Sequence, residues 1–427
     1  MTALALPDKA LASAVQALPD NSLAANRKAA LASFLDRGFP TPRLEDWKYT
    51  DLTAVAEISQ RWLENGALPS SAATLQDRIA EIRAAIDIDW IVISNGEMSD
   101  RGSLTGIDGI TIATFSDLAH APGFDHPLAD LNAALLPDGL HIRVAARSAR
   151  ARPLGLLIAD GADSHPGVAQ ARIRIELEAG SHAQFVEYHA SLGNADHYAN
   201  SVVELSLADG ASADYVRIQG RDPKHTQTHR TSVRLEDSST IRYSGFDLGG
   251  RLVRNDLDID IAGREATALV GGLYIAGDGQ HIDNHVRIDH RVGPARSEQE
   301  YRGILGGRCR CVWNGKAVVH AGADGTDAEQ SNHNLLLSDR AEIDAKPELE
   351  IYADEVKCSH GTTVGQLDDA ALFYLRSRGL DERDAKRALT RAFGASIVGD
   401  APIGLLTEHL TEMVERRLSL LGDGIDA

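Results

Sequence analysis

The sequence predicts a mainly β protein, in which a long β-solenoid is flanked by α-helical regions at both ends. Between residues 140 and 365, short runs alternate apolar and polar residues, as in ARIRIELEAGS, VVELSLADGAS and LDIDIAGREA. Small or acidic turns end these runs roughly every 25 to 30 residues, at Ala179-Gly180, Asp209-Gly210, Asp237-Ser238, Ala262-Gly263 and Val292-Gly293. A β-sandwich also explains the alternation, but a turn spacing maintained over such a long stretch favours stacked coils.

The residues before the solenoid predict helices. Apolar residues recur at helical spacing over 11–18 and 23–35, and the second run ends at Gly38, with Pro40 and Pro42 behind it. Residues 74–86 predict another helix, and DWIVI at 89–93 predicts the first strand. We therefore divide the chain into an N-terminal helical region at 1–88, a β-helix core at 89–365 and a C-terminal helical region at 366–427.

The C-terminal region predicts three helices. The first, at 368–377, starts with paired acids and is closed by Gly379. Asp381 caps the second, whose expected apolar side is formed by Ala385, Ala388, Leu389, Ala392 and Phe393. The third spans about 403–421, with an apolar stripe at Leu406, His409, Leu410, Met413 and Val414. We expect these helices to cap the end of the solenoid or to dock on a partner.

The overall charge narrows the possible partners. The chain has 427 residues and a formal net charge of −19, so it should repel nucleic acid and anionic lipid. Three cysteines are too few for a disulfide framework and fit a reducing compartment. The N-terminus lacks a basic segment followed by an apolar core, and no apolar run approaches 18 residues. We expect a cytoplasmic protein that binds neither nucleic acid nor membrane.

Familiar catalytic motifs are absent from the sequence. It has no G-x-x-x-x-G-K-[ST] motif, so the chain is not itself a P-loop ATPase. Gly277-Asp278-Gly279 has no third glycine at position 282, and neither G-x-S-x-G nor H-E-x-x-H occurs. We predict no catalytic residues and no enzymatic activity.

Cys358 and His360 stand two residues apart in V-K-C-S-H-G. On a strand, their side chains would project from the same face, roughly 6 to 7 Å apart. Iron, zinc or a cluster could bridge a thiolate and an imidazole at that spacing. The alternative is a buried thiol at the end of a strand, beside a hydrogen-bonded histidine.

Other cysteines and histidines are weaker candidates for ligands. Cys309 and Cys311 share a strand face with Trp313, and we expect them to pack in the solenoid rather than to join Cys358 and His360 in one site. His281, Asp283 and His285 on one strand face form another candidate ligand group, as do His225 and His229 if they lie on a helix. Surface or turn histidines explain both groups better.

Two long motifs resemble a known family. SNHNLLLSDRAEIDAKPELEIYADEVKCSHGTTVGQLDDAALFYLRSRGL, at 331–380, looks like the signature of the SufB/SufD family of iron–sulfur cluster assembly scaffold proteins. PRLEDWKYTDL, at 42–52, resembles the N-terminal motif of the SufD branch of that family. Length and the helix–solenoid–helix layout agree with the resemblance, which extends over the whole chain.

The resemblance implies a right-handed parallel β-helix that acts as a non-catalytic scaffold. Such a subunit pairs with SufB through the ends of their β-helices, and its C-terminal helical region binds the separate ATPase SufC. A nascent cluster forms at the SufB–SufD interface, so any cluster or iron would be transient and shared with SufB, and none is expected on the isolated chain. His360 is the leading candidate ligand at this interface, with Cys358 as the second candidate. The isolated chain is a possible homodimer.

Three alternatives remain open from the sequence. The first alternative is a SufB-like subunit that holds the cluster itself. The second is a β-helix enzyme that acts on polysaccharides, and the third is a homodimer with a purely architectural role. The N-terminal motif also leaves a choice, because Trp47, Lys48 and Tyr49 either mark a partner interface or pack the N-terminal region against the solenoid.

Overall fold

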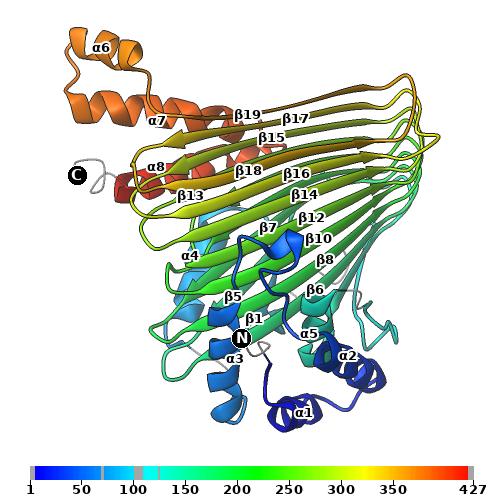
Figure 1. Cartoon of the computed structure of the whole chain (residues 1–427). Helices are drawn as coiled ribbons and strands as arrows, with labels where there is room; N and C mark the ends of the chain where they lie inside the picture. Colours follow the sequence, from blue (N-terminus) through cyan, green and yellow to red (C-terminus); the bar gives the residue numbers. More distant parts are fainter. Residues whose placement is uncertain (1–4, 69–71, 101–108, 124–125, 422–427) are drawn as a thin grey trace.

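The central strands wind into a parallel β-solenoid with two facing sheets (Figure 1). The structure is a computed structural model, and it describes residues 5–68, 72–100, 109–123 and 126–421. The strands of one face are β1 (Asp89–Ser94), β2 (Glu97–Asp100), β5 (Leu154–Gly161), β7 (His182–Leu192), β9 (Ser212–Gly220), β11 (Thr240–Asp247), β13 (Thr267–Ala276), β15 (Arg296–Leu305), β17 (Asp327–Leu336) and β19 (Lys357–Gly365). Those of the other face are β3 (Ile110–Thr114), β4 (Leu140–Val144), β6 (Gly167–Leu177), β8 (His197–Leu207), β10 (Thr226–Leu235), β12 (Leu252–Ile261), β14 (His281–His290), β16 (Arg310–Val319) and β18 (Glu342–Ile351).

Each coil contributes one long strand to each face. Within the described residues, the first sheet runs β19-β17-β15-β13-β11-β9-β7-β5-β1-β2 and the second β18-β16-β14-β12-β10-β8-β6-β4-β3. Pairing is parallel except for β1 with β2 and β3 with β4, which are antiparallel at the first end. The mainly β, parallel solenoid predicted from the alternating runs is thus confirmed.

The turns between coils stack on one another at the predicted positions. The N–H of Gly180 donates to the carbonyl of Asp209 (2.9 Å), and that of Gly210 donates to the carbonyl of Asp237 (2.8 Å). Both glycines have positive φ angles, 66° and 65°, which glycine adopts without the steric cost that a Cβ adds. The regular turn spacing in the sequence is therefore the period of the coil.

Side chains alternate between the two faces of each strand, so every second residue points into the interior of the solenoid. Inward positions such as Ile173 and Ile175 of β6 and Leu205 of β8 belong to one apolar core enclosed by both sheets. The inward residues of β7 and β9 change from apolar to polar along each strand, as from Phe185 to Glu187. The solenoid interior therefore has an apolar part and a buried polar part.

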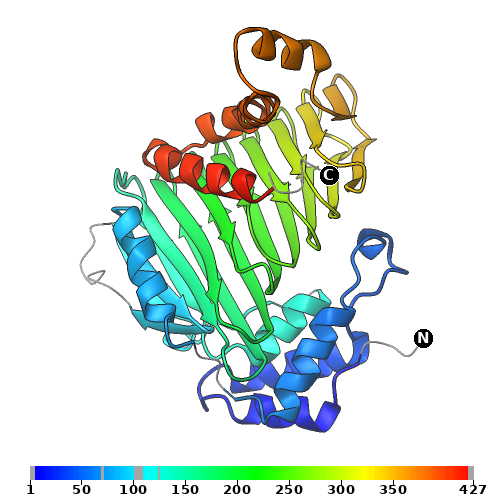
Figure 2. The same cartoon turned by 90° about the vertical axis from the view of Figure 1, so that its left-hand side faces the viewer.

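Three helices cover the outer face of the first sheet (Figure 2). They are α4 (Leu75–Ala85), α7 (Glu382–Gly399) and α8 (Thr407–Leu421), with the short 3-10 helix η2 (Gly404–Leu406) before α8. The expectation that the C-terminal helices cap the solenoid end or dock elsewhere is wrong for α7 and α8, because their apolar faces pack along its flank. The predicted face of α7 is also partly wrong: Ala388 and Ala392 are exposed, whereas Gly394 and Ile397 are buried.

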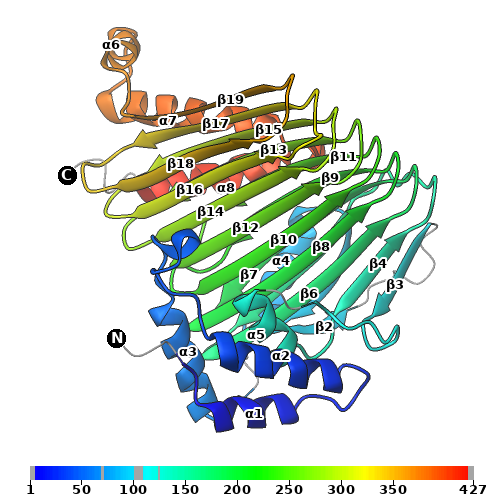
Figure 3. The same cartoon turned by 45° about the vertical axis from the view of Figure 1, so that its right-hand side comes forward.

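The N-terminal helices gather on the second sheet near the first coils (Figure 3). They are α1 (Asp8–Gln16), α2 (Ala24–Arg37), the 3-10 helix η1 (Glu45–Trp47) and α3 (Thr53–Glu64), together with α5 (Pro127–Leu135) from within the range 89–365. Their apolar side chains meet Tyr198, Val168 and Leu252 on the outside of this sheet. The helices predicted at 11–18, 23–35 and 74–86 are confirmed, while α3 and α5 were not predicted.

None of the helices in the described part of the chain is both long and apolar enough to cross a membrane.

Candidate functional site

The final coil of the solenoid is open. β18 and β19 are the terminal strands of their sheets, and their side chains are half-buried or exposed, unlike those of the preceding coils (Figure 1). One edge of each strand therefore carries backbone N–H and C=O groups that no strand of the described chain pairs with. Such an edge is a template on which another strand or solenoid can stack.

Cys358 and His360 lie on this open coil, in β19. They occupy the same face of the strand, as its alternation requires. The register pairs Cys358 with Ala328 and His360 with Gln330, two residues buried in the preceding coil. The two side chains thus extend the interior column of β17 onto the open coil, where Cys358 is half-buried and His360 is exposed.

Cys358 and His360 do not make a complete metal site on their own. Among the residues that the structure describes, no third His, Cys, Asp or Glu joins them in a set whose donor atoms all lie within 4.8 Å. Partial burial raises the pKa of the Cys358 thiol, so this thiol has to lose a proton before it can ligate. A metal or cluster at this position would need ligands from another chain.

Cys309 and Cys311 lie in the solenoid interior. Both are buried in the apolar core together with Trp313, which confirms the predicted packing position. A hydrogen bond from Cys311 lowers the pKa of Cys309, whereas burial raises the pKa of Cys311 well above its ordinary value. Cys311 is on β16 and Cys358 is on β19, in opposite sheets, and the four suggested donors do not meet in one cluster of the described residues.

His281, Asp283 and His285 share one face of β14, as predicted, but this face receives the N-terminal segment. Nε2 of His281 lies 2.8 Å from Oγ1 of Thr50, and the Thr50 hydroxyl also donates to Asp283. Nε2 of His285 lies 3.1 Å from Oδ1 of Asp283. These contacts show that the group holds the N-terminal segment against β14.

Trp47 is buried in the same contact, with 3% of its surface exposed. Nearby, Nζ of Lys346 on β18 lies 2.8 Å from Oε1 of Glu45, which also ties the segment to the solenoid. The blue segment that carries η1 accordingly rises along the second sheet in Figure 3. Of the two roles considered for Trp47, the structure supports packing between the helical region and the solenoid.

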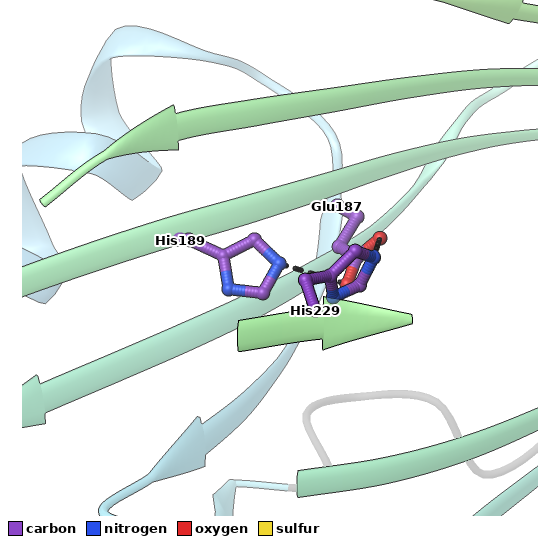
Figure 4. Close-up of side chains that lie close together, drawn as sticks. All are labelled: Glu187, His189 and His229. Carbon is purple, nitrogen blue, oxygen red and sulfur yellow. Dashed lines mark hydrogen bonds and ion pairs between the residues drawn. The ribbon is translucent and has the colours of Figure 1, made fainter. Parts of the chain in front are cut away.

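His225 and His229 could share a ligand group only on a helix, and this condition is not met, because residues 226–235 form strand β10. His225 lies beside His197, with ring centroids 5.6 Å apart. His229 instead meets Glu187 and His189 of β7 across the interior (Figure 4). In the sequence, only the spacing of Glu187 and His189, two residues apart in an alternating run, points to this group.

The helix α6 (Asp369–Ser377) has no buried residue and stands away from the solenoid in Figure 1. Asp368 caps it by accepting a hydrogen bond from the backbone N–H of Ala370 at 2.8 Å. Its aromatic residues Phe373 and Tyr374 are 74% and 57% exposed. Neighbouring exposed aromatic residues of this kind are typical of contact surfaces for another protein.

Comparison with known proteins gives a consistent result. The family described as "SUF system FeS cluster assembly, SufBD core domain" matches residues 158–393. The iron–sulfur cluster assembly protein SufD of Escherichia coli is 30% identical over 386 residues, which cover 86% of each chain. SufD of Bacillus subtilis is 26% identical, over 92% of this chain and 93% of its own. A SufBD family protein of Synechocystis is 26% identical, over 97% of this chain and 94% of its own.

Proposed function

The chain belongs to the SufB/SufD family of SUF-system iron–sulfur cluster assembly proteins and is SufD-like, and we propose that it is a scaffold subunit that pairs with SufB and binds the ATPase SufC. In this role it presents ligands for a nascent cluster at the interface and has no catalytic residue of its own. The observation that carries the proposal is the open final coil, with Cys358 and His360 on it.

Pairing through the final coil is supported by the unpaired strand edges. A partner solenoid with a matching edge would satisfy the backbone groups of β18 and β19 and cover their half-buried side chains. A second copy of this chain presents the same edges, which is why a homodimer remains an outcome for the isolated protein.

His360 is the leading cluster ligand in this proposal. Its ring is exposed, and the described part of the chain offers only Cys358 as a neighbouring donor of the same strand face, so SufB would supply the remaining ligands. Imidazole is a borderline ligand, which suits a cluster that is built and then transferred. The thiol of Cys358 becomes a second ligand only after losing its proton.

Binding of the ATPase is supported by α6. Phe373 and Tyr374 are exposed, although α7 and α8 beside them are held on the solenoid by buried side chains. The exposed aromatic side chains of α6 therefore lie next to two helices that are packed on the solenoid. Since the chain contains no P-loop, we assign ATP hydrolysis to the partner that binds there.

The first experiment is an anaerobic purification of the tagged chain from its native cell, with identification of the bound chains and assay of iron and acid-labile sulfide. Recovery of a SufB-type chain and of a P-loop ATPase would support the scaffold role. Recovery of the chain only with copies of itself would reject it in favour of an architectural homodimer.

The second experiment tests His360 in the reconstituted complex. His360→Ala should lower the iron and sulfide bound per complex, whereas Ser359→Ala, on the opposite face of β19, should leave them unchanged. Both positions are on an exposed strand, so neither substitution should alter the fold. Equal cluster content in the two variants would remove His360 from the ligand set.

A further inference from the structure

Three metal-ligating side chains meet inside the solenoid, far from the open coil. Glu187 and His189 are on β7, and His229 reaches them from β10 of the opposite sheet (Figure 4). In the described chain they are the one set of His, Cys, Asp or Glu donors that all lie within 4.8 Å of one another. Six strand-to-strand steps separate β7 from β19, which is roughly 29 Å at about 4.8 Å per step.

The nitrogen and oxygen atoms converge closely. Nε2 of His189 is 2.8 Å from Oε1 of Glu187, and Nε2 of His229 is 3.6 Å from Oε2. The rings of the two histidines meet edge to face, with centroids 5.0 Å apart. Donors bound to one ion at about 2.0–2.2 Å stand roughly 3.0–3.5 Å apart. The cluster is therefore close to the spacing that a bound ion imposes.

Both imidazoles are buried, and Nε2 of each ring faces the carboxylate of Glu187. Nδ1 of each ring has no hydrogen-bond partner among the described residues. Without an ion, the Nε2–H of His189 donates to the carboxylate of Glu187, which can only accept. Because Nδ1 has no partner, the ring can carry its proton there instead and turn the Nε2 lone pair toward an ion.

The charges around the cluster leave one negative charge without a matching guanidinium. Three buried carboxylates, Asp160, Glu187 and Asp247, face two buried guanidinium groups, Arg217 and Arg221. Asp247 binds Arg217 through two hydrogen bonds of 2.8 and 3.0 Å, and Arg221 lies 2.7 Å from Asp160. Three minus two leaves the carboxylate of Glu187 uncompensated, and burying such a group is costly unless a cation accompanies it.

We propose that Glu187, His189 and His229 form an internal binding site for one divalent transition-metal ion of the Zn²⁺ or Fe²⁺ class. Two imidazole nitrogens and one carboxylate oxygen are a donor set that these ions accept and that Mg²⁺ and Ca²⁺ disfavour. Oγ1 of Thr231 lies 2.9 Å from Nε2 of His229, which places a hydroxyl oxygen beside the three donors. The hydroxyl of Tyr215 donates to Oε2 of Glu187 at 2.7 Å and orients the carboxylate.

This site is independent of the proposed interface and departs from the expectation that the isolated chain holds no metal. The three side chains are fully enclosed, with exposed fractions of 0%, 0% and 2% for Glu187, His189 and His229. An ion would therefore enter while the coils assemble and would leave only when they open. Its function is structural: it joins the two sheets and neutralises Glu187. The competing interpretation is a metal-free cluster in which a shared proton takes the place of the ion.

The test begins with the full chain carrying Cys358→Ala and His360→Ala, so that the final coil contributes no ligand. The protein is expressed in medium with added zinc and iron, purified natively, dialysed against EDTA and analysed for all first-row metals. We expect about one zinc or iron ion per chain to survive dialysis, because the site is enclosed. A metal content near zero would overturn the proposal, without touching the scaffold role.

Matched variants locate the ion. Glu187→Gln and His229→Gln should each lower the retained metal by about tenfold or more, whereas His197→Gln, at another buried histidine of the interior, should leave it unchanged. Retention of the same metal in all variants would reject these ligands. Should the triad variants fail to fold, cobalt substitution of the parent chain decides: bands from nitrogen and oxygen ligands support the site, and a thiolate charge-transfer band would assign the ion to Cys309 and Cys311 instead.

Discussion

The guanidinium carbon of Arg254 lies 4.4 Å from the centroid of the Trp47 ring. This contact joins the N-terminal motif to the outside of β12. Arg254 also donates to the carbonyl of Asp46 at 2.9 Å and pairs with Asp283 of β14. Burial by itself would raise the pKa of Asp283, but Arg254, His285 and His281 together outweigh it and hold that pKa far below its usual range. Arg254 thus contacts both the indole ring of Trp47 and the buried carboxylate of Asp283.

Trp47→Ala should destabilise this contact. The indole is 3% exposed, and removing a buried Trp side chain typically costs about 3–5 kcal/mol of unfolding free energy. Urea unfolding measures the loss, and limited proteolysis should show faster cleavage within 38–52. Lys48→Ala, at an exposed neighbour, is the control and should change stability by less than about 0.5 kcal/mol. Equal stability of the two variants would contradict the packing role of Trp47.

The C-terminal helices should separate stability from partner binding. Leu410 of α8 is fully buried against the first sheet, so Leu410→Ala should lower the unfolding free energy by about 2–5 kcal/mol. Phe373 of α6 is 74% exposed, so Phe373→Ala should change it by less than about 0.5 kcal/mol.

The Phe373→Ala variant also tests ATPase binding by co-purification. Phe373→Ala should reduce capture of the ATPase although the chain stays folded, because the exposed ring is part of the proposed contact surface. Full capture by Phe373→Ala would place the ATPase contact elsewhere.

Gly272→Ala should destabilise the interior. A Cβ at position 272 would stand 2.1 Å from Cε1 of Tyr301, whose buried ring fills the space left by the glycine. Forcing one extra carbon into a packed core costs about 1–3 kcal/mol, which thermal unfolding detects as a lower Tm. Gly361→Ala is the matched control in β19, since no atom lies within 4 Å of its added Cβ. A Tm loss no larger than that of the control would mean that the ring moves aside freely.

Acid should destabilise the chain through histidines buried in neutral form. Burial lowers the pKa of His197 to about 3 and that of His290 to about 4, whereas an unfolded histidine titrates near pH 6.5. The unfolded state therefore binds more protons between these values, and stability falls as the pH drops below about 6.5. At pH 5 the loss from His197 alone is about 2 kcal/mol.

Unfolding free energies in urea between pH 7.5 and pH 5 measure this effect. His197→Gln should give a flatter pH profile than the unmodified chain, because the glutamine does not titrate. Profiles with the same slope would show that His197 does not carry the acid sensitivity.

The alternation of the central runs and the spacing of their turns determined the solenoid without reference to any partner element. Both features are local: the side-chain period of a strand is two residues, and each glycine or small turn residue acts at its own position. The helix caps at Asp368 and Asp381 are equally local, since each side chain accepts from a backbone N–H two or three residues ahead. The common face of Cys358 and His360 also follows from strand parity alone.

Only the tertiary structure decided which distant residues meet. His229 reaches Glu187 and His189 because two sheets face each other with a particular coil register, and no local pattern specifies that register. The contact of His281 with the N-terminal segment depends on the position of Thr50, which is 231 residues away in the sequence. The position of α7 and α8 on the flank was likewise hidden, because an apolar stripe shows that a helix is covered but not by which surface.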